Sequence, residues 1–146
     1  MTRCEHTQTG HVIIWSLLVV AVLFAIKATF ELGPHRELLL VGIGLLITLA
    51  SFYKLTIRID DETLCASFGV GIIRKRVSIA EIAGCEPIRI RWWYGWGIHL
   101  TPYGWLYNVS GLDAVAITLR NGRKFALGTD APHELVKAIR RLAPPN

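Results

Sequence analysis

Residues 12–53 read VIIWSLLVVAVLFAIKATF, then ELGPHRE, then LLLVGIGLLITLASFY. A helix that crosses a membrane needs about 20 mostly apolar residues. The first segment, 12–30, meets this requirement when Lys27 extends its amine toward an interface, and the second segment, 38–53, is slightly shorter. Gly33-Pro34 breaks any helix between them. The stretch therefore predicts a hairpin of two transmembrane helices.

A soluble core helix or a signal peptide fits these segments less well. Helices buried in a soluble core carry a polar face with a period near 3.6 residues, and residues 17–26 have none. A signal peptide has a basic start and a small-residue cleavage pattern before a polar mature chain, whereas here a second apolar segment follows. Trp15 and Tyr53 suit the aromatic belt at one face of a membrane. We therefore expect residues 1–11 and 54–146 on the same side of the membrane.

The positive charge lies beside this hairpin. The chain has 146 residues and a net charge of +5, and residues 54–146 hold 13 of its 16 Lys and Arg residues. Because Lys and Arg close to membrane spans stay on the cytoplasmic side, we expect residues 54–146 in the cytoplasm. The three cysteines lack paired spacing and fit reduced thiols. Cys4, His6 and His11 lack the spacing of metal ligands, so no metal is expected.

Beyond the hairpin, apolar residues alternate with polar ones, which is typical of half-buried strands. The predicted strands are 54–60, 64–68, 72–79, 86–93, 97–101, 105–109, 114–120 and 124–129. Trp92 is expected to face inward, and Lys75 interrupts an apolar face, as on an edge strand. An amphipathic helix follows over 131–142, with Asp130 as its cap and Pro132 in its first turn. Three regions result: a disordered tail over 1–11, the hairpin over 12–53 and a soluble domain over 54–146.

Several strings within this pattern resemble a known group of proteins. They are LTIRIDDETL (55–64), IAEIAGCEPI (79–88), WWYGWGI (92–98), YNVSG (107–111) and AVAITLRNGRKFALGTD (114–130). With the preceding hairpin, the chain resembles small bacterial membrane-anchored proteins of unknown function that carry a pleckstrin-homology (PH)-like domain. The resemblance implies an antiparallel barrel or sandwich of about seven strands with one C-terminal helix. It also implies a location on the cytoplasmic side of a bacterial inner membrane, and it implies no activity.

One departure from the PH pattern concerns ligands. PH domains that bind phosphoinositides resemble one another in a basic loop between their first two strands. Here that loop is Asp60-Asp61-Glu62, whose acidic side chains repel a phosphate. Inositol phosphate binding at that loop is therefore not expected.

Two basic segments are candidate binding surfaces. The candidate residues are Arg74, Lys75, Arg76, Arg89, Arg91, Trp93, Tyr94 and Trp96. The first three could contact anionic lipid headgroups or form a solvated strand face. The others interleave basic with aromatic side chains, which suits a membrane interface, a protein interface, or a core and turn cluster. Stacking on single-stranded nucleic acid is not favoured, because the chain is tethered to a membrane and its charge is modest.

Catalytic patterns are weak. His99, Ser110 and Asp113 form the one nearby Ser/His/Asp set, and no G-x-S-x-G context surrounds Ser110. We therefore expect no enzymatic activity and no cofactor. The favoured hypothesis is a membrane-anchored interaction module that docks a protein partner or a second copy of itself at the inner membrane. The alternative hypothesis is a module that binds or senses anionic phospholipids, whose binding would weaken with salt.

Overall fold

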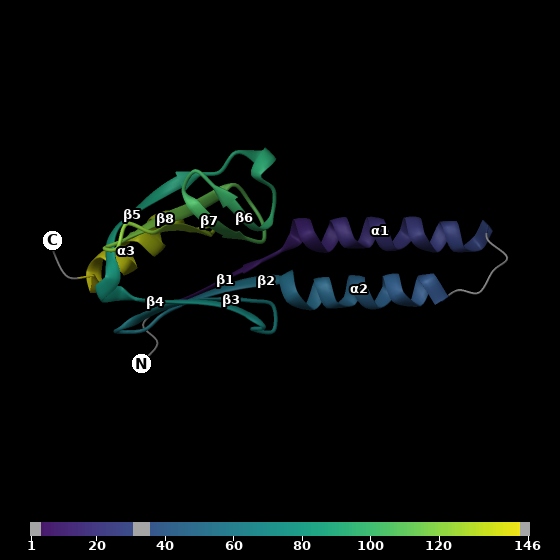
Figure 1. Ribbon diagram of the computed structural model, residues 1–146, viewed down its shortest axis with the longest axis horizontal. Coiled ribbons are helices and arrows are strands. Elements are labelled where there is room, and N and C mark those ends of the chain that lie inside the picture. Colours follow the sequence, from purple (N-terminus) through teal and green to yellow (C-terminus); the bar gives the residue numbers. More distant parts are fainter. Residues whose placement is uncertain (1–3, 31–35, 144–146) are drawn as a thin grey trace.

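The computed structural model describes residues 4–30 and 36–143. Its elements follow in the order β1 (Cys4–Thr9), α1 (His11–Phe30), α2 (Arg36–Phe52), β2 (Lys54–Ile59), β3 (Thr63–Phe68), β4 (Ile73–Ser78), η1 (Ile79–Glu81), β5 (Ile82–Arg89), η2 (Trp92–Tyr94), β6 (Gly97–Thr101), β7 (Gly104–Asn108), β8 (Asp113–Leu119), β9 (Lys124–Gly128) and α3 (Pro132–Leu142). Figure 1 shows the strands gathered at one end of the molecule, while α1 and α2 extend side by side away from them.

The strands form two sheets. The first has the order β1-β2-β3-β4 and the second β5-β8-β9-β7-β6. All pairs are antiparallel except β7 with β9, which run parallel. The prediction of a mostly-β chain that ends in one helix is confirmed. The prediction of about seven antiparallel strands is wrong in two details, because the described residues include nine strands and one parallel pair.

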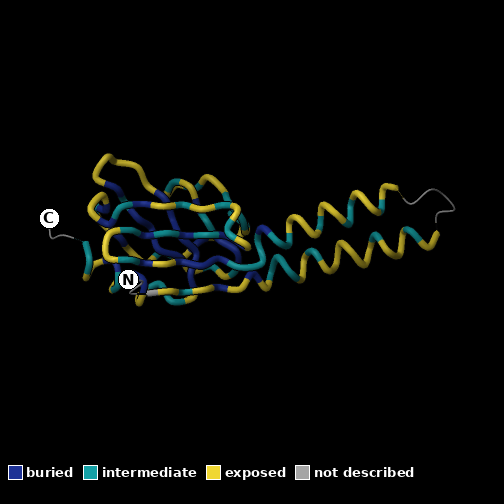
Figure 2. The backbone as a smooth tube through the Cα atoms, turned by 90° about the horizontal axis from the view of Figure 1, so that it is seen from below, coloured by how far each residue is buried: buried dark blue, intermediate teal, exposed yellow. Residues whose placement is uncertain are grey.

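Both sheets contribute to one hydrophobic core. Leu55 and Ile57 of β2 share a buried cluster with Val115 and Ile117 of β8. The amphipathic α3 adds Leu135, Val136 and Ile139 to the same cluster and packs against β5 and β8. Figure 2 shows these buried segments inside the β-structure, whereas α1 and α2 have exposed and half-exposed surfaces.

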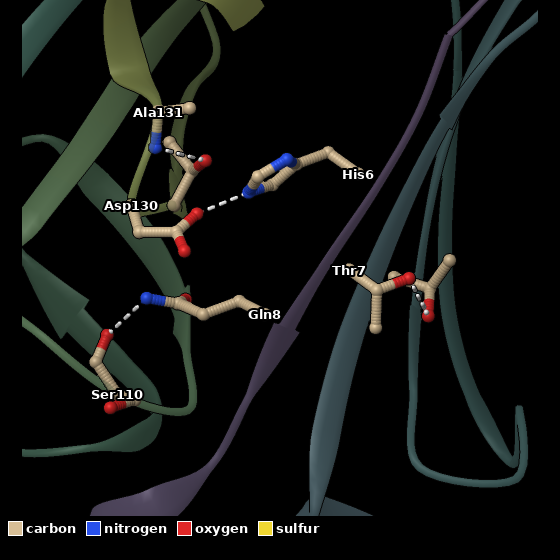
Figure 3. A network of polar contacts seen from close by, with 8 residues as sticks. His6, Thr7, Gln8, Ser110, Asp130 and Ala131 are labelled. Carbon is tan, nitrogen blue, oxygen red and sulfur yellow. Dashed lines mark hydrogen bonds and ion pairs between the residues drawn. The ribbon is translucent and has the colours of Figure 1, made fainter.

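The N-terminal residues differ from the prediction of a disordered tail. Residues 4–9 form β1, and all six pair antiparallel with β2. The inward side chains of β1 are polar: the Gln8 amide donates to the carbonyl of Ser110 at 2.8 Å, and the His6 ring contacts the Asp130 carboxylate (Figure 3). A strand without alternating apolar residues gives no periodic signal, which explains the error.

This pairing changes the relation between the hairpin and the β-structure. Because β1 precedes α1 and its partner β2 follows α2, the helices are an insertion between two adjacent strands of one sheet. Asp130 contacts His6 and does not cap α3, whose N-cap is Ala131 without a side-chain hydrogen bond. The predicted cap is therefore wrong, whereas Pro132 lies in the first turn as expected.

The two helices differ in length. Among the described helices only α1, with 20 residues, is long and apolar enough to cross a membrane, and none of its residues is buried. The second helix has 17 residues, of which Ser51 is buried. Of the two predicted transmembrane helices, only α1 therefore has the length and composition to cross a membrane, and α2 is too short to qualify. The predicted break at Gly33-Pro34 lies outside the described residues.

The helices join the sheets at a compact junction, which we call the hairpin root (residues 10, 50–53 and the β3–β4 turn, 69–72). The amide of Gly10 donates to the carbonyl of Tyr53 at 2.7 Å, and the amide of Val70 donates to that of Ala50 at 3.2 Å. The ring centroid of Phe68 lies 5.7 Å from that of Phe52 and 6.0 Å from that of Tyr107. These contacts couple the end of α2 to both sheets.

Candidate functional site

The connection between β5 and β6 carries three exposed tryptophans, Trp92, Trp93 and Trp96. Because β5 and β6 are opposite edges of the second sheet, residues 90–96 have to cross its other three strands. Ile90 and Tyr94 pack on the outer face of that sheet, against Leu106 and two alanines. We call residues 90–96 the aromatic crossover.

The outward side chains of the aromatic crossover are exposed. Trp92 is 71% exposed and Trp93 is 55% exposed, and their ring centroids lie 6.0 Å apart. The Arg91 guanidinium lies 4.9 Å from the Trp93 ring centroid, close enough for a cation–π interaction. The expectation that Trp92 faces inward is wrong, because β5 ends at Arg89 and the alternation that places Trp92 inward does not continue beyond the strand.

The aromatic crossover lies at the end of the β-structure from which the helices leave. Ile98, two residues after Trp96, pairs with Tyr107, whose ring contacts Phe68, the last residue of β3 before the hairpin root. Figure 1 shows the short η2 turn, coloured between teal and green, at the same end of the β-structure as the start of α1. The aromatic crossover and the two helices are therefore at the same end of the β-structure.

The predicted basic residues divide between two places. Arg74 and Arg76 are exposed on the outer face of the first sheet, whereas Lys75 turns to the opposite face, with its ammonium 5.5 Å from the Phe125 ring centroid. Arg89 and Arg91 are exposed beside the aromatic crossover. β4 is an edge of its sheet, as the position of Lys75 predicts. The structure thus assigns the two basic segments to different sheets.

Arg74 and Arg76 line a groove of about 560 Å³ on the outer face of β2, β3 and β4. Lys54 and Arg58 line the same groove, where the one carboxylate among the lining residues is that of Asp60. We call this the basic groove. The sequence pattern does not indicate it. Alternation alone places Arg58 on the outer face, but the register that aligns Arg58 with Arg76 through β3 cannot be derived from the spacing of residues.

No family model, curated protein or solved structure matches the chain. The PH-like resemblance stays a prediction, and the function is inferred from the two surfaces. In the weak catalytic pattern of His99, Ser110 and Asp113, the ring nitrogen Nε2 of His99 donates a hydrogen bond to the backbone carbonyl of Trp96 at 2.5 Å. Residues 4–30 and 36–143 contain no group of three or more His, Cys, Asp or Glu residues that could hold a metal.

Two acidic groups shielded from solvent predict how stability depends on pH. Burial raises the pKa of the Cys85 thiol above its ordinary value of 9.0, against a smaller lowering by Arg140, and burial also raises the pKa of the Tyr107 phenol. The folded state holds these protons more tightly than the unfolded state does. The stability that these groups contribute is therefore fully present below pH 9.0, and it is lost as the pH rises through their pKa values in the folded state.

We expect these two groups to leave the midpoint temperature of thermal unfolding unchanged near neutral pH and to lower it above about pH 9. The double variant Cys85→Ala, Tyr107→Phe should show a shallower alkaline decline, measured by circular dichroism between about pH 7 and 11 in a non-ionic detergent. An equally steep decline in the variant would show that other groups control the alkaline limit.

Proposed function

We propose that the protein is a membrane-anchored, non-catalytic interaction module with a PH-like barrel or sandwich. Its helical hairpin lies in a bilayer, and its aromatic crossover rests on the lipid surface. The observation that carries this proposal is that the exposed apolar helices leave the β-structure at the end where the exposed tryptophans of the aromatic crossover lie (Figure 1).

The helices expose more apolar surface than a protein keeps in water. The large exposed apolar residues of α1 and α2 are Trp15, Leu18, Val19, Val20, Val22, Leu23, Ile26, Phe30, Leu39, Leu40, Ile43, Leu46 and Ile47. Contiguous patches of this kind mark membrane or partner contacts. At a rise of about 1.5 Å per residue, α1 is about 30 Å long and α2 about 25 Å. Their lengths suit a hydrocarbon core of about 30 Å when the bilayer thins slightly beside α2.

The pairing of β1 argues against a cleaved signal sequence. Removal of α1 would detach β1, which pairs along its length with β2 and contacts the second sheet through His6 and Gln8. The α1 helix is also unlike a helix in the core of a soluble protein, since none of its residues is buried. Permanent membrane insertion accounts for both observations.

The aromatic crossover has the chemistry of a membrane interface. Indole rings favour headgroup depth, and Trp15, one turn into α1, is 64% exposed near the end of the helix that joins the β-structure. Arg89 and Arg91 add positive charge there, which favours anionic phospholipids by about 1 kcal/mol for each side chain. Lys54 follows the second helix directly, and by the positive-inside rule this charge supports a cytoplasmic position of the β-structure in a bacterium.

Depth-dependent tryptophan quenching tests this proposal. The chain has five tryptophans, so the variant Trp15→Phe, Trp105→Phe keeps those of the aromatic crossover. In proteoliposomes we expect phospholipids brominated near the headgroup to quench this variant strongly. A matched variant that keeps Trp105 alone should be quenched weakly. Equal and weak quenching of both variants would refute the contact with the lipid surface, and extraction of the chain by alkaline carbonate would refute membrane insertion.

A separate observation supports a second candidate function, the docking of another copy of the chain. Leu100 and Trp105 pair across the β6–β7 hairpin and are exposed, together with Tyr103 in its turn. This patch lies at the opposite end of the β6–β7 hairpin from Gly97 and the hairpin root. Chemical crosslinking in native membranes should yield a dimer that the Trp105→Ser variant loses. An unchanged dimer, or none in the parent protein, would exclude this surface.

A further inference from the structure

The basic groove concentrates positive charge on a concave surface of the first sheet. Four cations line it: Lys54 and Arg58 from β2, and Arg74 and Arg76 from β4. Asp60 supplies the one carboxylate among the lining residues. Grouped cations on a hollow surface raise the local concentration of anions, and they repel one another until an anion binds.

The strand register brings the arginines together. Arg58 pairs with Cys65, and Cys65 pairs with Arg76, so the two arginines flank Cys65 in one row across three strands. With strands about 4.8 Å apart, the Cα atoms of the two arginines are about 10 Å apart, and their long side chains can converge on one group. Arg74 is two residues from Arg76 on the same strand and faces the same side.

The charges of the groove are incompletely satisfied by the protein. Glu5 is the carboxylate partner of Arg58, at 3.2 Å, on the exposed side of β1. The Nε of Arg74 donates to the carbonyl of Gly71 at 2.7 Å, a contact that holds the side chain in place. Among the described residues, neither Arg74 nor Arg76 has a carboxylate partner. Their guanidinium groups are therefore available for an anion.

The floor of the groove is small and polar. Thr56, Thr63 and Ser67 line it between the cationic walls. Hydroxyl groups can donate to phosphate oxygens, and arginine binds phosphate through two parallel hydrogen bonds. A volume of about 560 Å³ exceeds the needs of a bare phosphate and lies in the usual range for small-molecule sites.

We infer that the basic groove binds a phosphate-bearing ligand through Arg58, Arg74 and Arg76, with Ser67 on its floor. This site is distinct from the aromatic crossover, and of the acidic loop at residues 60–62 only Asp60 lines it. Lys54 follows the hairpin root directly, so the groove begins beside the hairpin root and runs away from it along the strands. If the hairpin lies in a bilayer, as in the proposed function, the groove begins next to the lipid headgroups. The phosphate can therefore belong to a lipid headgroup or to a soluble phosphate ester.

Cys65 offers a local reporter for the groove, because its half-exposed side chain lies between Arg58 and Arg76. The full chain with Cys4→Ser is placed in nanodiscs of phosphatidylcholine. Alkylation by uncharged N-ethylmaleimide is then followed by mass spectrometry, and the buried Cys85 serves as a control for folding. One arm adds inorganic phosphate or glycerol 3-phosphate against chloride at constant ionic strength. The other arm adds phosphatidic acid to the nanodiscs.

We expect a phosphate probe to slow the alkylation of Cys65 several-fold. The triple variant Arg58→Gln, Arg74→Gln, Arg76→Gln should lose this protection. A matched variant with the same loss of charge outside the groove, Arg123→Gln, Lys124→Gln, Arg141→Gln, should keep it. Protection by the soluble probes assigns the ligand to a soluble phosphate ester, and protection by phosphatidic acid alone assigns it to a headgroup.

Absence of protection in both arms, or equal protection in the groove variant, would overturn the inference. The result is independent of the proposed membrane contact, because none of the substituted residues belongs to the aromatic crossover. Tryptophan quenching and thiol protection can therefore fail separately.

Discussion

Replacing Phe68 with alanine is expected to lower the free energy of unfolding by about 3–5 kcal/mol. The Phe68 side chain is fully buried, and its ring contacts Phe52 of α2 and Tyr107 of the second sheet. Its loss leaves a cavity at the point where the hairpin root joins both sheets. Urea unfolding of the full chain in non-ionic detergent, followed by near-ultraviolet circular dichroism, measures the effect.

Ile72→Ala provides the matched control for this substitution. Ile72 lies in the turn that follows Phe68 and is 70% exposed. Its truncation should change the free energy of unfolding by less than about 0.5 kcal/mol. Similar values for the two variants would mean that the aromatic contacts of Phe68 do not stabilise the junction.

The second large effect is expected for Gly69→Ala, at about 3 kcal/mol or more. Gly69 has a φ of +52°, a left-handed conformation that costs an alanine about 1–2 kcal/mol. A Cβ atom there would also overlap the carbonyl oxygen of Ala50 and lie 2.7 Å from that of Ser51. The β3–β4 turn would have to move away from the end of α2. Thermal unfolding in detergent measures the loss.

Gly122→Ala separates the two causes of this effect. Gly122 also has a positive φ, +83°, but a Cβ atom there would meet nothing within 4 Å. It should therefore cost only the conformational term of about 1–2 kcal/mol. Equal losses in the two variants would show that the turn does not press against α2.

The strands of the β-structure are largely predictable, because each buries one face. Leu55, Ile57 and Ile59 alternate with polar residues and are buried as the pattern predicts. Asn121-Gly122 predicts the turn between β8 and β9, which holds a glycine with positive φ. Periodicity succeeds in these strands because one sheet face packs on the core and the other is solvated.

The errors arise where tertiary contacts replace periodicity. β1 presents polar His6 and Gln8 to Asp130 and Ser110, more than a hundred residues away, and its sequence carries no apolar signal. Trp92 faces inward only if alternation continues past Arg89, where β5 ends. A pattern cannot indicate where the chain leaves a sheet to cross over it.

The sequence predicts which residues belong to the candidate surfaces, but it does not predict how they come together as sites. Arg74, Arg76 and the tryptophans at 92, 93 and 96 stand out in the sequence, and all are exposed. The basic groove also needs Arg58, which comes from a strand whose register with β4 depends on the two intervening turns. Side chains that meet across three strands are fixed by the fold and not by local spacing.

The position of β1 sets the order of events during synthesis. The ribosome makes β1 first, yet its partner β2 emerges only after both helices have been translated. In a membrane-inserted chain, the N-terminus must therefore be retained on the side where β2 will appear, and the sheet cannot close until the second helix has returned. In the proposed membrane-inserted state, folding of the first sheet would thus act as a check on topology, since a chain with one helix misoriented would keep β1 and β2 on opposite sides of the bilayer.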